Sequence, residues 1–188
     1  MKYKAISTEE TLPVDLPFLK KQLRITGDDQ DIYLRSLIGA ATRNRQDFTG
    51  RQFVRATLMA YTAYTGRMSY EIERGPVKAI TKIEIVQEDN TVLTLAPSDY
   101  IVILEELSAF VIIDAYEKLV NVSLTRPDAI QITYTAGWTG EEDSRFPEDV
   151  INSVAMMASR MFTNPDDAVD EKCSVSDNLL RAYRCPIV

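Results

Sequence analysis

Residues 130–165 read IQITYTAGWTGEEDSRFPEDVINSVAMMASRMFTNP and pass from a strand pattern to a helix pattern. Ile130, Ile132 and Tyr134 alternate with polar residues, which is the period of a strand with one buried face. Beyond a glycine turn, apolar residues recur at helical spacing until Asn164-Pro165, where proline disfavours a helical residue before it. The stretch therefore predicts a strand that leads directly into a helix.

The helix expected over residues 147–163 is apolar over most of its surface. Pro147 sits at the expected first helical position, and two acidic residues follow it in the positive first turn. Such a helix has to be covered by the rest of the chain, by another chain, or by both. The apolar residues at helical spacing are Val150, Val154, Met157, Ala158 and Met161, widened by Ile151, Ala155 and Phe162.

The N-terminal part predicts two helices after a polar lead-in over residues 1–12. The first helix is expected over 16–25 and the second over 30–49. An aspartate in Thr26–Asp29 is expected to cap the second helix, because its oxygen can accept from free amides at a helix start. Gly50 is expected to end that helix. The apolar face of the second helix comprises Leu34, Leu37, Ile38, Ala41 and Phe48.

Between these helices and residue 135, helical spacing gives way to β-branched and aromatic alternation with frequent turn signals. The pattern predicts six to eight short strands and a hairpin between 80–86 and 91–95. Their number and spacing are typical of a small sandwich or barrel. The expected strands are 53–65, 68–73, 80–86, 91–95, 100–104, 109–114, 119–124 and 130–135.

The predicted fold class is therefore α+β. A small helical bundle of N-terminal and C-terminal helices would carry an inserted antiparallel β-sandwich or barrel-like region. A single domain over 1–188 would divide into N-terminal helices (1–52), a β insertion (53–135) and C-terminal helices with a tail (136–188). A last short helix is expected over 178–183, capped by Ser176-Asp177.

Composition argues against several classes of function. The net charge of the 188-residue chain is −7, so a basic stripe that grips nucleic acid is not expected. The chain has no histidine, which removes the commonest general base and most zinc sites. Neither a membrane span nor a signal peptide is expected. We predict no catalytic, cofactor-binding or metal-binding residue.

Acidic pairs and cysteines have plain interpretations. Adjacent carboxylates do not face one another on a helix or strand, so Glu105-Glu106, Glu141-Glu142 and Asp166-Asp167 are interpreted as solvated loop charges. Cys173 and Cys185 are interpreted as free thiols. For Trp138, packing in a core or interface is expected, and a platform for a ligand is the alternative.

Four motifs in order give the chain a resemblance to the head–tail connector, or adaptor, proteins of long-tailed phages and prophages. The N-terminal LKKQLRITGDDQDIYLRSLIGAAT resembles the opening of that family, and DFTGRQF at 47–53 resembles its YTGR motif. ITYTAGW at 132–138 with the helix after it, and LLRAYR at 179–184, resemble its later motifs. The departures are Ala182, where the family often has proline, and a long insertion over 87–128.

The resemblance implies a structural virion protein without enzymatic activity. Subunits would form a ring of about twelve that docks on the portal protein and links the capsid to a tail or stopper protein. Double-stranded DNA would pass through without sequence-specific binding, and an acidic ring would suit that passage. The protein would lie at the head–tail junction of the virion, and in the host cytoplasm during assembly. A β-rich protein-binding module and an enzyme with a carboxylate-based or cofactor-based site are the alternatives.

Two groups of interface residues are expected. By the resemblance, the portal-facing group is the C-terminal motif, whose residues could instead dock on their own subunit: Leu179, Leu180, Arg181, Tyr183 and Arg184. Arginines near the end of the second helix either stabilise that helix end or contact an acidic partner. The candidate subunit-interface residues are Arg43, Arg45, Arg51, Met156 and Arg160.

Overall fold

The computed structural model describes residues 1–164 and 174–185. The chain forms two compact units. Residues 1–9 and 55–137 make the first unit, and residues 10–54 with the described part of 138–188 make the second. The first unit is built of strands and the second of helices, so the α+β class expected from the sequence is confirmed.

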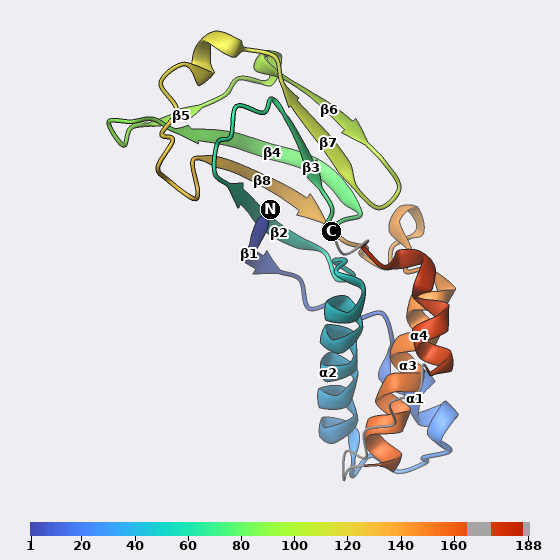
Figure 1. Cartoon of the computed structure of the whole chain (residues 1–188). Helices are drawn as coiled ribbons and strands as arrows, with labels where there is room; N and C mark the ends of the chain where they lie inside the picture. Colours follow the sequence, from blue (N-terminus) through green and yellow to red (C-terminus); the bar gives the residue numbers. More distant parts are fainter. Residues whose placement is uncertain (165–173, 186–188) are drawn as a thin grey trace. The chain divides into compact units, whose positions relative to one another are not determined.

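The larger sheet of the first unit has five strands in the order β1-β2-β8-β4-β5, and all neighbours are antiparallel. The strand expected over 130–135, β8, lies at its centre (Figure 1). β4 and β5 form the expected hairpin. The strands are β1 (Lys2–Thr8), β2 (Ala56–Thr62), β8 (Ile130–Ala136), β4 (Val77–Val86) and β5 (Val92–Thr94).

A second antiparallel sheet has three strands in the order β3-β7-β6. These strands are β3 (Ser69–Ile72), β7 (Ala109–Ile113) and β6 (Tyr100–Leu104). The buried side chains of the two sheets belong to one hydrophobic core, as in a β-sandwich. Fully buried members of that core include Ala60, Ile72, Ile83, Ile85, Val111, Ile113, Ile130, Ile132 and Tyr134.

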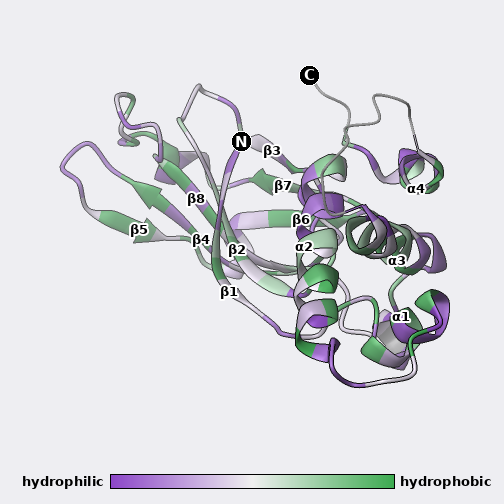
Figure 2. Cartoon of the chain, turned by 90° about the horizontal axis from the view of Figure 1, so that it is seen from below, coloured by the Kyte–Doolittle hydropathy of each residue, from purple (hydrophilic) through white to green (hydrophobic). Residues whose placement is uncertain are grey.

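Four α-helices lie in the described part of the second unit: α1 (Leu16–Leu23), α2 (Asp31–Thr49), α3 (Glu148–Thr163) and α4 (Val175–Leu179). Buried residues recur at helical spacing in α1 and α2, so each helix has one face towards the core, and both ribbons carry hydrophobic and hydrophilic segments (Figure 2). α2 and α3 run side by side (Figure 1), and Tyr33 packs against Phe162 with ring centroids 6.2 Å apart. None of the helices among the described residues is long and apolar enough to cross a membrane.

Gly50 ends α2 as predicted. Its φ of 71° is left-handed, and its N–H donates to the carbonyl oxygen of Gln46 at 2.9 Å. A Cβ at this position would lie 3.1 Å from the Cβ of Cys185. Glycine is therefore favoured here by its backbone conformation and by a close neighbour from the end of the chain.

Three segments differ clearly from the pattern of strands expected from the sequence. Residues 1–12 are not only a lead-in, because Lys2–Thr8 forms the edge strand β1, which pairs with β2. An edge strand at the surface needs few apolar residues, so its sequence looked polar. Phe53 lies outside the strand expected over 53–65, because its ring packs on Trp138 at 5.9 Å in the second unit. Residues 119–124 hold the end of a 3-10 helix and one isolated bridge at Val122.

The expected helix starts also differ in detail. Asp28 does not cap α2, since its Oδ1 accepts from Lys20 Nζ at 2.6 Å and the cap residue is Gln30. Pro147 is the N-cap of α3 rather than its first helical residue. Short 3-10 helices cover Pro97–Asp99, Tyr116–Leu119, Glu142–Ser144 and Arg181–Tyr183. Shifts of one or two residues at a helix end are common, because helix ends fray.

Replacing Ile132 in β8 by alanine should destabilise the first unit by about 2–5 kcal/mol, because a fully buried side chain would leave a cavity at the centre of the sheet. The matched control is Ile6→Ala in β1, since Ile6 is 53% exposed and should change stability by less than about 0.5 kcal/mol. Urea unfolding of both variants checks this. Equal losses would contradict a core centred on β8.

Candidate interface at the C-terminal segment

Residues Ser174–Cys185, here named the C-terminal segment, begin with a capping box at the start of α4. Ser174 Oγ accepts from the N–H of Asp177 at 3.3 Å, and Asp177 Oδ2 accepts from the N–H of Ser174 at 2.9 Å. The box satisfies free amides at the helix start. It places this start three residues before the boundary expected from the sequence.

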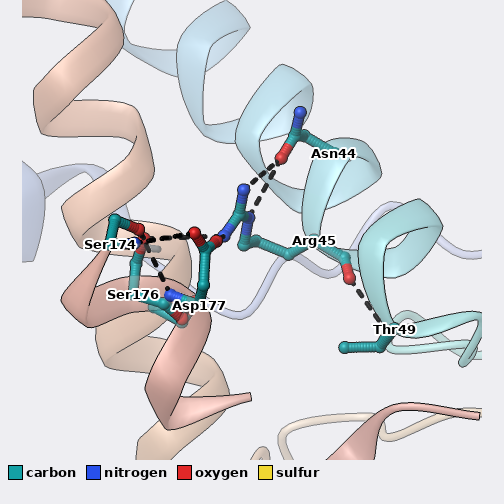
Figure 3. Close-up of polar contacts among 7 residues, drawn as sticks. Asn44, Arg45, Thr49, Ser174, Ser176 and Asp177 are labelled. Carbon is teal, nitrogen blue, oxygen red and sulfur yellow. Dashed lines mark hydrogen bonds and ion pairs between the residues drawn. The ribbon is translucent and has the colours of Figure 1, made fainter. Parts of the chain in front are cut away.

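An ion pair joins the C-terminal segment to α2. Arg45 Nη1 donates to Asp177 Oδ1 at 2.5 Å, and the side chains are 6% and 20% exposed (Figure 3). Arg45 also donates to Asn44 Oδ1 through Nε and Nη2. Its guanidinium lies 5.1 Å from the centre of the Phe48 ring. A buried guanidinium held by these groups fixes the position of α4 against α2.

Three further hydrogen bonds hold the segment along its length. Ser153 Oγ of α3 donates to the carbonyl oxygen of Ser176 at 2.8 Å. Arg51 Nε donates to the carbonyl oxygen of Tyr183 at 2.9 Å. The N–H of Cys185 donates to the carbonyl oxygen of Thr49 at 2.8 Å, which satisfies a carbonyl at the end of α2.

Trp138 sits in an aromatic cluster that includes the C-terminal segment. Its ring centroid lies 5.9 Å from that of Phe53, 6.5 Å from Phe146 and 6.4 Å from Tyr183. The Tyr183 contact is edge-on, a favourable arrangement for aromatic rings. Trp138 is 8% exposed. The structure therefore supports packing for Trp138 rather than a platform for a ligand.

The residues of the C-terminal motif divide into an inward and an outward group. Leu180 is completely buried and Tyr183 half-buried, so both hold the segment to its own unit. For Leu180 the expected contact with a partner is contradicted, since its side chain has no exposed surface. Arg181 and Arg184 are exposed, and Leu179 is half-buried. Both arginines are exposed, and the Arg184 guanidinium also lies 5.0 Å from the centre of the Phe48 ring.

The candidate subunit-interface residues divide in the same way. Arg45 and Arg51 are 5% and 7% exposed and bind the C-terminal segment, so the expectation that they meet a neighbour is corrected to an intrachain role. The sequence did not show this, because their partners lie 132 residues away. Arg43 is exposed, Met156 is 39% exposed and Arg160 is half-buried.

The pKa of Asp177 is held below its usual value of 3.8. Burial alone would raise this pKa, but hydrogen bonds from Ser174 and the ion pair with Arg45 outweigh that effect. The carboxylate therefore adds stability above pH 3.8, and the contribution is lost as the pH falls through the folded-state pKa.

The other sequence-based expectations concern charges and thiols. Glu105-Glu106 and Glu141-Glu142 are exposed, as solvated charges should be, whereas Asp166-Asp167 and Cys173 lie outside the described residues. Cys185 is half-buried. Within the described part of the chain, no three His, Cys, Asp or Glu side chains gather in a way that could hold a metal ion.

A comparison of sequences matches residues 14–93 to the phage gp6-like head-tail connector protein family. The matched range runs from just before α1 into β5. The resemblance to head–tail connector proteins is confirmed. No curated protein sequence matches the chain at a significant level.

Solved structures with the same fold come from gene transfer agent (GTA) particles. A chain in the neck of an empty GTA particle, computed with C6 symmetry, has a TM-score of 0.77 at 16% identity. Chains in the virion of a native GTA particle and in its neck computed with C12 symmetry give TM-scores of 0.71 and 0.69, at 16% and 17% identity. Each alignment covers 100% of this chain and 97% of the other. The insertion at 87–128, expected to depart from the connector family, therefore lies within the shared fold.

Replacing Asp177 by asparagine should lower the free energy of unfolding by about 2–4 kcal/mol at pH 7, because Arg45 would be left buried without its counter-charge. The loss should shrink as the pH falls below 3.8, where the parent chain loses the same interaction. Urea unfolding between pH 7 and pH 3 measures both effects. The control is Asp47→Asn, an exposed aspartate of α2. A variant as stable as the parent at pH 7 would contradict the anchoring role.

Leu180→Ala should lower the free energy of unfolding by about 2–5 kcal/mol, since the side chain is completely buried. Leu179→Ala, at the half-buried neighbouring position, is the matched control and should cost less. Thermal and urea unfolding check the pair. If Leu179→Ala lowered the free energy of unfolding more than Leu180→Ala, the burial of Leu180 would be contradicted.

Proposed function

We propose that the chain is a structural, non-enzymatic protein that forms a ring-shaped connector between the head and tail of a phage-like particle. The match of residues 14–93 to the head–tail connector family carries this proposal. The fold shared with chains from GTA necks supports it, and two of those necks were computed with C6 and C12 symmetry. A cyclic assembly of identical subunits requires two different contact surfaces on each copy.

The portal-contacting element in this proposal is the C-terminal segment. Leu180 and the Arg45–Asp177 pair hold the segment, while Arg181 and Arg184 are exposed, with the Arg184 guanidinium 5.0 Å from the centre of the Phe48 ring. Arginine is favoured at interfaces, because its planar guanidinium can bind carboxylates and carbonyls in several directions. A segment already held in place loses little further conformational entropy on binding. The partner surface on the portal would be acidic.

Ring formation and DNA passage complete the proposed role. About twelve subunits would surround the DNA, and a tail or stopper protein would bind the face away from the portal. Arg43, Met156 and Arg160 remain candidates for subunit contacts, since each keeps some exposed surface. A chain with a net charge of −7 has little general attraction for phosphates. DNA could then pass without being retained. The protein would act at the virion head–tail junction, after assembly in the host cytoplasm.

The double variant Arg181→Ala/Arg184→Ala should bind purified portal protein at least about tenfold more weakly than the parent, because two interface cations are removed. Its melting temperature should fall only slightly, since both side chains are exposed and the intrachain contact that is lost is that of the Arg184 guanidinium with the Phe48 ring. Biolayer interferometry with immobilised portal protein measures the binding.

The matched control is Lys21→Ala/Arg24→Ala, which removes two exposed cations from the same unit outside the C-terminal segment. This control should bind portal protein like the parent. Equal binding by both double variants and the parent would rule out the C-terminal segment as the portal contact. Absence of binding by the parent itself would contradict the proposed connector function.

A further inference from the structure

The strand β6 is apolar at all five positions, Tyr100 to Leu104. Such a run is typical of a strand that is buried on both faces. In the structure one face of the three-stranded sheet packs on the core, and Ile101 and Ile103 on the other face are 53% and 48% exposed. The second face of β6 therefore lacks the cover that its sequence indicates.

The exposed apolar surface continues onto β7. Ile101 lies opposite Ile112 and Ile103 lies opposite Phe110 in the antiparallel register, so the four side chains share one face. Ile112 and Phe110 are half-buried. These four residues, here named the outer face of the sheet, form a contiguous apolar patch. Such patches on soluble proteins mark interaction sites.

The edge formed by β6 is also less protected than the other sheet edges in this unit. β1 carries two lysines and an irregular register between Ala5 and Ser7, whereas β5 has three residues and β3 has four with a glutamate. β6 has neither a charge nor a register shift. Proteins commonly shield exposed edges with charges, bulges or a covering helix. Among the described edge strands, β6 is therefore the one where a covering element is most expected.

The charged residues beside β6 indicate what kind of surface would cover it. Glu105 and Glu106 follow β6 directly and are exposed. Ser108 Oγ donates to Glu105 Oε2 at 2.7 Å, and neither glutamate forms an ion pair with another described residue. The outer face is therefore apolar with an acidic border. A matching surface would be apolar with basic residues beside it.

The solvent-facing side of α2 has that character. Ile32 is 87% exposed, and Arg43 lies on nearly the same line of the helix at an offset of eleven residues. Arg35 flanks this line, and neither arginine forms an ion pair within residues 1–164 and 174–185. Between them, a Cβ built on Gly39 would meet no atom within 4 Å, so the helix backbone is open to close approach there.

We infer that the outer face of the sheet in one copy of the chain contacts the exposed side of α2 in a second copy. The contact would place Ile32 on the patch around Ile101 and Ile103, and Arg35 and Arg43 near the acidic end of the β6–β7 hairpin. Its two halves are different surfaces, as a head-to-tail ring requires. The inference rests on the proposed ring and names its subunit interface.

Two sets of variants test the contact by sedimentation velocity of the full-length chain, alone and with portal protein. Ile101→Glu should weaken self-association at least about tenfold, because it buries a charge in the apolar patch. The matched control is Ile6→Glu in β1, since Ile6 is equally exposed at 53% and should leave assembly unchanged. Circular dichroism of both variants verifies that the fold is retained.

Charge reversal tests the identity of the partner surface. Glu105→Lys/Glu106→Lys and Arg35→Glu/Arg43→Glu should each weaken assembly at least about tenfold, and the combined fourfold variant should regain most of the parent's assembly. Lys2→Glu/Lys4→Glu is the control for a change in net charge. Recovery in the fourfold variant, with both controls unaffected, supports the contact.

Other outcomes overturn it. If Ile101→Glu assembles like the parent, the outer face is not a subunit contact, while the ring itself stands. If Ile101→Glu disrupts assembly but the fourfold variant does not recover, α2 is not the partner surface. A parent chain that stays monomeric, alone and on portal protein, overturns the proposed ring and this contact together.

Discussion

The second unit depends on the buried ion pair between Arg45 and Asp177. This pair ties α4 to the C-terminal part of α2, across 132 positions of sequence. A buried charge is costly without its partner, so the pair is satisfied only when α4 is docked. Leu180 and the Trp138–Tyr183 contact add apolar packing to the same arrangement. The exposed arginines after α4 are consequently held in a defined position.

The first unit depends on the central position of β8 in its larger sheet. Its inward side chains are completely buried, and it pairs with β2 on one side and β4 on the other. Directly after this strand, Trp138 enters the second unit. The stretch 130–165 therefore supplies the centre of one core and, through α3, a wall of the other. This explains why apolar residues recur at every second position in the strand and at helical spacing in α3.

Much of this architecture could be predicted from the sequence, because local patterns determined it. The alternation in β8, the helical face of α2 and the glycine at its end are signals within a few residues, and each matches the structure. The family motifs added the connector resemblance, which the family match confirmed. Features that depend on distant partners were missed. Arg45 looked like a helix-end cation because nothing near it in sequence indicates Asp177.

The candidate interface shows the same division. The LLRAYR motif is recognisable in the sequence, but the sequence does not indicate that Leu180 is buried while Arg181 and Arg184 are exposed. Lys2–Thr8 looked like a polar lead-in because edge strands carry few apolar residues. The sequence does not show that Ile101 and Ile103 are exposed, because this follows from the position of β6 at the edge of its sheet. Sequence periodicity gives the faces of an element, and tertiary structure decides which face is covered.

We propose that this chain forms rings that connect the head and tail of a phage-like particle. Electron microscopy of the chain mixed with its portal protein tests it most directly. We expect a ring of about twelve copies seated coaxially on the portal, with the C-terminal segment at the junction. Isolated copies that leave the portal bare would contradict it.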